Sequence, residues 1–166
     1  MTTIPNPLIV VPDDEPVVLA GTYLEPRLRQ LGQVVFYDTR PKDAQGLVER
    51  IRDADVVVNI RSSVIFSDQV LQQCPRLKLI SVYGVGYDNV DTQAASRLGI
   101  AVTNTPGYSA VAVSEMTLGL MLAVAKNLAR NDRDVRQDRW ARGYGMQLAG
   151  KTLGVIGVGD IGRRVV

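Results

Sequence analysis

Residues 153–162 read Leu153-Gly154-Val155-Ile156-Gly157-Val158-Gly159-Asp160-Ile161-Gly162, a stretch in which an apolar segment runs directly into three spaced glycines. In the pattern Gly-x-Gly-x-x-Gly the first glycine makes a tight turn and the second lets the backbone approach a pyrophosphate. The third lets the following helix pack on the strand. The motif predicts a strand–turn–helix unit that binds a dinucleotide at its helix N-terminus, through Gly157, Gly159, Asp160, Ile161 and Gly162. A plain glycine-rich turn without a ligand is the alternative.

Upstream of this stretch, strand-like and helix-like segments alternate. Short apolar runs predict five strands, at residues 8–11, 34–37, 55–60, 77–82 and 100–104. Helical patterns fill the intervals at residues 17–31, 44–54, 68–74 and 92–98, with Pro26 expected to kink or split the first. Ser67 and Asp91 are expected to cap the last two. This alternation predicts an α/β fold, a doubly wound parallel sheet with helices on both faces.

The pattern changes after residue 104. Asn104-Thr105-Pro106-Gly107 breaks the alternation and is interpreted as a hinge. The longest helical stretch follows, from residue 110 to about residue 130, and its middle is apolar on nearly every side. Such a helix is expected to be buried between layers or at a subunit contact. Residues 131–140 are charged and predict a solvated helical face.

Composition excludes several classes of function. The 166 residues carry a net charge of +2 and are 46% hydrophobic, which is ordinary for a globular protein and gives no reason to expect nucleic acid or a membrane as partner. The single cysteine, Cys74, permits no intrachain disulfide and favours a reducing compartment. The first residues show no secretory signal pattern, and the apolar run at 118–125 is far shorter than the ~20 residues of a membrane-spanning helix. We therefore expect a cytoplasmic protein.

These 166 residues contain no histidine. Histidine is the most common general acid or base and the most common metal ligand in proteins. The stretch therefore offers no histidine-based catalytic pair and no histidine-liganded metal site, and we predict neither a metal nor a catalytic residue within it.

Two segments are candidates for binding an anion. Gly84-Val85-Gly86 follows the strand at 77–82, and glycines there let backbone N–H groups point at a carboxylate. Arg61 follows the strand at 55–60, and a guanidinium suits a carboxylate or a phosphate. A ligand-free tight turn and a solvated charge are the respective alternatives. Asp88 and Asp91 could form a metal or acid/base pair, but Asp88-Asn89 is expected to hold the turn and Asp91 to begin the next helix.

Three further stretches, taken together, resemble the D-isomer-specific 2-hydroxyacid dehydrogenases. Residues 79–91 are similar to the family's substrate loop. Residues 104–107, then Val113-Ser114-Glu115 and the apolar helix, resemble its interdomain hinge and long helix. Residues 138–140 and 148–157 resemble its approach to the nucleotide fingerprint.

The resemblance implies a flavodoxin-like substrate domain at residues 1–104. Residues 105–166 would then form a long interdomain helix and the truncated start of a Rossmann dinucleotide-binding domain. It implies that the substrate carboxylate lies on Val85 and Gly86, with Arg61 and Ser62 helping to hold the substrate. The implied reaction interconverts a small 2-hydroxy acid and a 2-keto acid by hydride transfer with NAD, NADP being left open. The implied partner is a second copy, bound through the helix at 110–130.

The family's catalytic arginine, glutamate and histidine lie beyond the region that these residues match. We therefore expect the 166-residue chain to be an N-terminal portion that is inactive alone and binds cofactor weakly. We also expect its strand at 153–156 to lack neighbours. A non-catalytic carboxylate-binding or regulatory partner module is the alternative function.

Overall fold

The computed structural model describes residues 5–166. The chain divides into two compact units, one that runs to Pro106 and one from Gly107 to Val166. Each unit has its own elements and is considered by itself.

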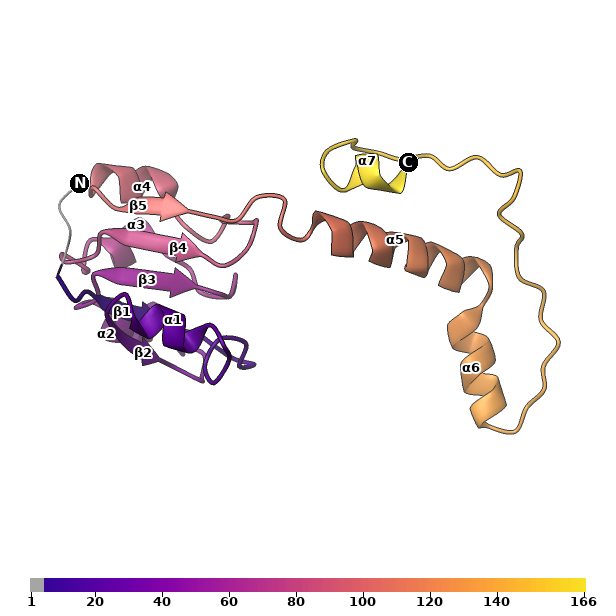
Figure 1. The fold of residues 1–166 in the computed structure, drawn as a ribbon, viewed down its shortest axis with the longest axis horizontal. Helices are drawn as coiled ribbons and strands as arrows, with labels where there is room; N and C mark the ends of the chain where they lie inside the picture. Colours follow the sequence, from indigo (N-terminus) through magenta and orange to yellow (C-terminus); the bar gives the residue numbers. More distant parts are fainter. Residues whose placement is uncertain (1–4) are drawn as a thin grey trace. The chain divides into compact units, whose positions relative to one another are not determined.

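The first unit is built on a five-stranded parallel sheet (Figure 1). The strands are β1 (Leu8–Val11), β2 (Gln33–Phe36), β3 (Val56–Asn59), β4 (Leu79–Val82) and β5 (Ala101–Thr103), in the spatial order β2-β1-β3-β4-β5. The predicted doubly wound parallel α/β fold is confirmed. Because β2 lies on one side of β1 and β3 on the other, the direction of winding reverses between β1 and β3.

Helices cover the two faces of this sheet unequally. α2 (Ala44–Ile51), α3 (Asp68–Leu71) and α4 (Thr92–Arg97) contribute side chains to one large core cluster, together with Val57 of β3 and Ile80 of β4. α1 (Glu25–Arg29) lies over the other face, where Leu28 packs near Val58. Since successive strand residues point to opposite faces, Val57 and Val58 belong to different clusters. Val57 and Ile80 are fully buried, which contributes roughly 1.5–3 kcal/mol each.

Aspartates begin two of these helices. Asp43 accepts a hydrogen bond from the Gly46 N–H at 2.8 Å, and Asp91 accepts one from the Ala94 N–H at 2.8 Å. The predicted cap at Asp91 is confirmed. Ser67 also stands at the cap position of α3, but its side chain makes no capping hydrogen bond.

The predicted helix at residues 17–31 is wrong for most of its length, since α1 covers only Glu25–Arg29. The buried Asp14 carboxylate accepts hydrogen bonds from the N–H groups of Val18, Leu19 and Ala20 and holds this segment in turns. Pro26 stands in the first turn of α1, where its missing N–H costs nothing, so it marks a helix start rather than a kink.

The second unit contains α5 (Ala110–Ala125), α6 (Leu128–Arg136) and α7 (Gly162–Val165), and α7 packs against α5. The prediction of one helix from 110 to about 130 is wrong at its C-terminal end. Asn127 adopts a left-handed conformation with φ 56°, which asparagine tolerates better than most residues, and α6 begins after it. Met116, Leu120 and Val124 of α5 are more than half exposed.

Among residues 5–166 no single helix is long and apolar enough to cross a membrane. Together, α5 and α6 have the length and apolar composition of a membrane-spanning helix, but they are bent by 62° relative to each other.

The predicted strand at 153–156 does not form. In the described chain no strand follows β5, and residues 151–156 are irregular, with Ile156 fully exposed. A parallel strand is stabilised by hydrogen bonds to neighbouring strands, and the second unit, as described, provides no neighbour. The apolar pattern is therefore present without the partner that would make it a strand.

Candidate functional site

Four chain segments meet the carboxyl edge of the sheet. Because all strands are parallel, the residues that follow β1, β3, β4 and β5 leave the sheet at the same edge. Open parallel sheets bind ligands at this edge, at the point where the winding reverses. Here that point lies between β1 and β3, and β4 is the next strand beyond β3.

Residues 84–89, which we call the β4 loop, carry two backbone donors without partners. Within residues 5–166 the N–H groups of Val85 and Gly86 donate no hydrogen bond, and both residues are exposed. By contrast, the neighbouring carbonyls of Gly84 and Val85 are both occupied. Two adjacent free N–H groups on an exposed loop are suited to an anion.

The glycines of the β4 loop are not required by the fold. A Cβ at Gly84 would meet nothing within 4 Å, and one at Gly86 would meet only the Asp88 Oδ2 atom at 3.8 Å, an ordinary contact. Neither glycine has a positive φ. Steric need within this chain therefore does not explain them, which counts against the interpretation as a plain tight turn.

Asn89 ties the β4 loop to the segment after β3. Its buried Nδ2 donates to the Val64 carbonyl at 2.6 Å and to the Arg61 carbonyl at 3.3 Å. The Phe66 N–H also donates to the Asn89 carbonyl at 2.8 Å. Asn89 thus joins the β4 loop to the segment that carries Arg61, and its side chain bonds that segment rather than its own turn.

Arg61 is half-buried and turns toward the segment after β1. One of its terminal nitrogens donates to the Pro16 carbonyl, while its buried Nε has no hydrogen-bond partner among the described residues. Ser62 is exposed beside it. A buried guanidinium N–H without a partner costs free energy, which an acceptor from a ligand would recover. Arg61 is therefore not a simple solvated charge.

Two buried carboxylates support this side of the edge, and they were not among the predicted site residues. Asp13 accepts from the Ser63 hydroxyl at 3.1 Å and pairs with Arg40 at 3.5 Å. Asp14 is fully buried and accepts three backbone N–H groups. The available signal was a pair of aspartates one residue after a buried strand. They position the segment that carries the Pro16 carbonyl, and through it Arg61.

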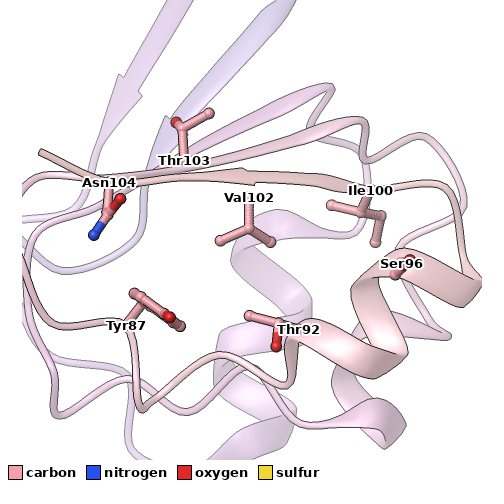
Figure 2. Close-up of a pocket in the computed structure, with 7 residues that line it drawn as sticks. All are labelled: Tyr87, Thr92, Ser96, Ile100, Val102, Thr103 and Asn104. Atoms are coloured by element: carbon pink, nitrogen blue, oxygen red, sulfur yellow. The ribbon is translucent and has the colours of Figure 1, made fainter. Parts of the chain in front are cut away.

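A cavity of about 480 Å³ lies beside the β4 loop (Figure 2). Its lining comes from the loop, from α4, and from β5 with the residues on either side of it: Tyr87, Thr92, Ser96, Ile100, Val102, Thr103 and Asn104. None of these side chains is charged, so the cavity does not suit a carboxylate as the free N–H groups do. No sequence pattern predicted it.

The glycine turn of the second unit is tight at its first and third glycines. Gly157 has φ +87°, and a Cβ at Gly162 would lie 2.0 Å from the Gly157 carbonyl oxygen. The first and third glycines are thus required by the turn itself. A Cβ at Gly159 would meet nothing within 4 Å, so this middle position is open. Asp160 pairs with Arg163, and Ile161 is exposed.

The remaining candidates for chemistry are a reactive thiol and a metal site. Burial, and secondarily the nearby Asp53 charge, raises the pKa of the Cys74 thiol from 9.0 to about 11, so this thiol is a poor nucleophile. Residues 5–166 bring together no group of three His, Cys, Asp or Glu side chains able to hold a metal ion.

Comparison with known proteins gives a consistent picture. A family model described as "D-isomer specific 2-hydroxyacid dehydrogenase, catalytic domain" matches residues 15–156. The chain is 42% identical over 141 residues to D-3-phosphoglycerate dehydrogenase of Methanocaldococcus jannaschii, covering 84% of this chain and 26% of the relative. It is 40% identical over 135 residues to glyoxylate reductase of Aeropyrum pernix, covering 76% of this chain and 40% of the relative.

A solved structure supports the same family assignment. An NADPH-dependent glyoxylate/hydroxypyruvate reductase from Sinorhizobium meliloti, in complex with NADP and malonate, superposes with a TM-score of 0.78 at 28% identity, covering 97% of this chain and 49% of that one. The chain thus spans about a quarter to two fifths of these curated relatives and about half of this solved chain. The predicted resemblance is confirmed, and the chain belongs to the D-isomer specific 2-hydroxyacid dehydrogenase family.

Proposed function

We propose that this chain holds the carboxylate of a small 2-hydroxy or 2-keto acid during NAD(P)-linked interconversion of the two. The observation that carries the proposal is the pair of unpartnered N–H groups at Val85 and Gly86, on an exposed loop at the carboxyl edge of the sheet. Family membership supplies the reaction class.

The binding roles follow from the chemistry of each group. The N–H groups of Val85 and Gly86 would each donate to a carboxylate oxygen. Arg61 would add a charge-assisted contact, and the exposed Ser62 hydroxyl would donate to a second polar group of the substrate. Hydrogen bonds to a charged group contribute about 1.5–3 kcal/mol each. The relatives named for phosphoglycerate and glyoxylate support small acids, with or without a phosphate, as the substrate class.

The glycine turn fits one part of a dinucleotide. The close approach of Gly162 to Gly157 and the open space at Gly159 support a pyrophosphate on residues 157–162, with Asp160 and Ile161 contributing backbone N–H groups. When bound, the nicotinamide cofactor, NAD or NADP, supplies or accepts the hydride at the substrate carbon. We propose that this chain alone binds the dinucleotide weakly. In the described part of the chain no strand lies beside residues 153–156, and α7 has only four residues.

We further propose that residues 1–104 act as the substrate domain, and that residues 105–166 act as an interdomain helix and the incomplete start of a dinucleotide domain. The exposed apolar side chains of α5, at Met116, Leu120 and Val124, support a homodimer contact within the predicted range 110–130. The break at Asn127 ends the continuous helix of that range at Ala125. The lone, buried Cys74 fits a reducing, cytoplasmic setting.

The 166 residues alone are proposed to be inactive. Interconversion of an alcohol and a carbonyl needs a group that moves the hydroxyl proton, and these residues include no histidine. The alternative, a carboxylate-binding or regulatory module, rests on the same β4 loop, so binding and turnover must be measured separately.

The test combines calorimetry with an activity assay on the pure chain. We expect glyoxylate and hydroxypyruvate to bind, glycolaldehyde, which lacks the carboxylate, not to bind, and Arg61→Gln to weaken binding. NADH should not be consumed. Absence of binding by both acids would overturn the proposed site, whereas NADH consumption would overturn the proposed inactivity. If the chain binds the acids without turnover, and its source makes no larger protein that contains it, the result would favour the carboxylate-binding or regulatory module.

A further inference from the structure

Asn104 and Thr105 follow β5 directly and precede the start of the second unit at Gly107. Three hydrogen bonds from these two residues end on the β4 loop. Thr105 donates to the Gly84 carbonyl twice, from its N–H at 2.8 Å and from its Oγ1 at 2.9 Å. Asn104 donates from Nδ2 to the Val85 carbonyl at 2.8 Å.

The acceptors are the carbonyls that share peptide planes with the two free donors. A peptide unit is planar and trans, so the Gly84 carbonyl and the Val85 N–H point in opposite directions within one rigid group. The Val85 carbonyl and the Gly86 N–H form the next such group. Fixing both carbonyls therefore fixes the directions of both N–H groups, which face away from Asn104 and Thr105.

The β4 loop needs such a restraint. Gly84 and Gly86 have more accessible backbone conformations than any other residue type, and an unrestrained loop would lose that freedom on binding a ligand. Hydrogen bonds accepted by a carbonyl also polarise its peptide group and strengthen the N–H donor at the other end. The three contacts thus both order and activate the two donors.

We propose that Asn104 and Thr105 are positioning residues that aim the Val85 and Gly86 N–H groups at the substrate carboxylate. The inference rests on the proposed function of the β4 loop. If the two residues only ended β5 and stabilised the chain there, changing them would lower the stability of the first unit without altering the loop's affinity for an acid.

The variants separate these roles. Thr105→Val removes the Oγ1 donor at nearly constant shape and keeps the backbone bond, while Thr105→Ser retains the hydroxyl. Asn104→Leu removes the amide donor at similar size. Thr103→Val is the matched control, because Thr103 is exposed and its hydroxyl has no hydrogen bond among the described residues.

The first measurement is made without ligand, on the backbone amides of Val85 and Gly86 in the 166-residue chain. We expect order parameters of about 0.85 in the unaltered chain, in Thr105→Ser and in Thr103→Val, falling below about 0.6 in Thr105→Val and Asn104→Leu.

The second measurement is the Kd for glyoxylate, with the thermal midpoint recorded in parallel. Loss of one hydrogen bond is expected to weaken binding about fivefold in Thr105→Val and Asn104→Leu, with recovery in Thr105→Ser and no change in Thr103→Val. Unchanged Kd values in Thr105→Val and Asn104→Leu, with the unaltered chain binding normally, would overturn the positioning role alone. If glyoxylate does not bind the unaltered chain, the proposed function and the inference both fall.

Discussion

Replacing Asp14 with asparagine tests how the sheet edge is supported. Oδ1 of Asp14 accepts from Val18 N at 2.9 Å, and Oδ2 accepts from Ala20 N at 2.8 Å. In Asp14→Asn one of these oxygens becomes an NH₂ group, so in either amide orientation a donor faces a backbone N–H donor. The side chain is fully buried, and water cannot relieve the conflict.

The expected loss follows from these contacts. A hydrogen bond to a charged acceptor contributes about 1.5–3 kcal/mol, and a buried donor left without a partner adds a further cost. We predict that Asp14→Asn lowers the free energy of unfolding by about 2–4 kcal/mol. With a denaturant slope of about 1–1.5 kcal/mol/M, the urea midpoint should fall by about 2 M.

The assay is urea unfolding followed by NMR at the buried amides of Val57 and Ile80, which report on the first unit alone. Asp38→Asn is the matched control, because it is the same chemical change at an exposed aspartate. The reasoning is refuted if the two variants have midpoints within about 0.3 M of each other, equivalent to less than about 0.5 kcal/mol.

Three further predictions concern other parts of the chain. Gly162→Ala should force the turn open, because its Cβ would lie 2.0 Å from the Gly157 carbonyl oxygen. Gly159→Ala has open space around its Cβ and should leave the amide NMR spectrum of residues 157–162 nearly unchanged. Equal spectral changes in the two variants would count against the turn geometry. The folded state holds the Cys74 proton more tightly than the unfolded state, with a pKa of about 11 instead of 9.0, so the free energy of unfolding should fall as the pH rises from 9.0 toward about 11. Cys74→Ala should show a flatter dependence of the free energy of unfolding on pH across that range, and parallel curves for the two proteins would disprove this. Asn127→Val should cost about 1–2 kcal/mol at the left-handed position between α5 and α6 and Asn127→Gly should not, as measured by thermal unfolding of the helical circular dichroism signal; equal midpoints for the two variants would contradict this.

Local chemistry explains what could be predicted from the sequence. The strands of the first unit are short apolar runs whose neighbouring strands lie in the same unit, and the cap at Asp91 acts on a residue three positions away. The candidate residues Arg61, Val85 and Gly86 were found because they follow strands, and parallel strands end at one edge.

The errors arose where distant contacts decide the structure. Residues 17–24 have a helical pattern, yet the Asp14 carboxylate accepts hydrogen bonds from the N–H groups of Val18, Leu19 and Ala20 and holds them in turns. Residues 153–156 have a strand pattern, yet a strand needs a neighbour that the described chain does not provide. The Asn104 and Thr105 contacts with the β4 loop join residues 19 and 21 positions apart, and no local pattern predicts them.

The most direct test of the central claim is an amide NMR titration of the 166-residue chain with glyoxylate. We predict that the largest shifts fall on Val85 and Gly86, that the Arg61 side-chain Nε–H also shifts, and that glycolaldehyde reproduces none of these changes. If the shifts appear elsewhere, or if glycolaldehyde produces the same pattern, the β4 loop does not hold a substrate carboxylate and the proposed function is contradicted.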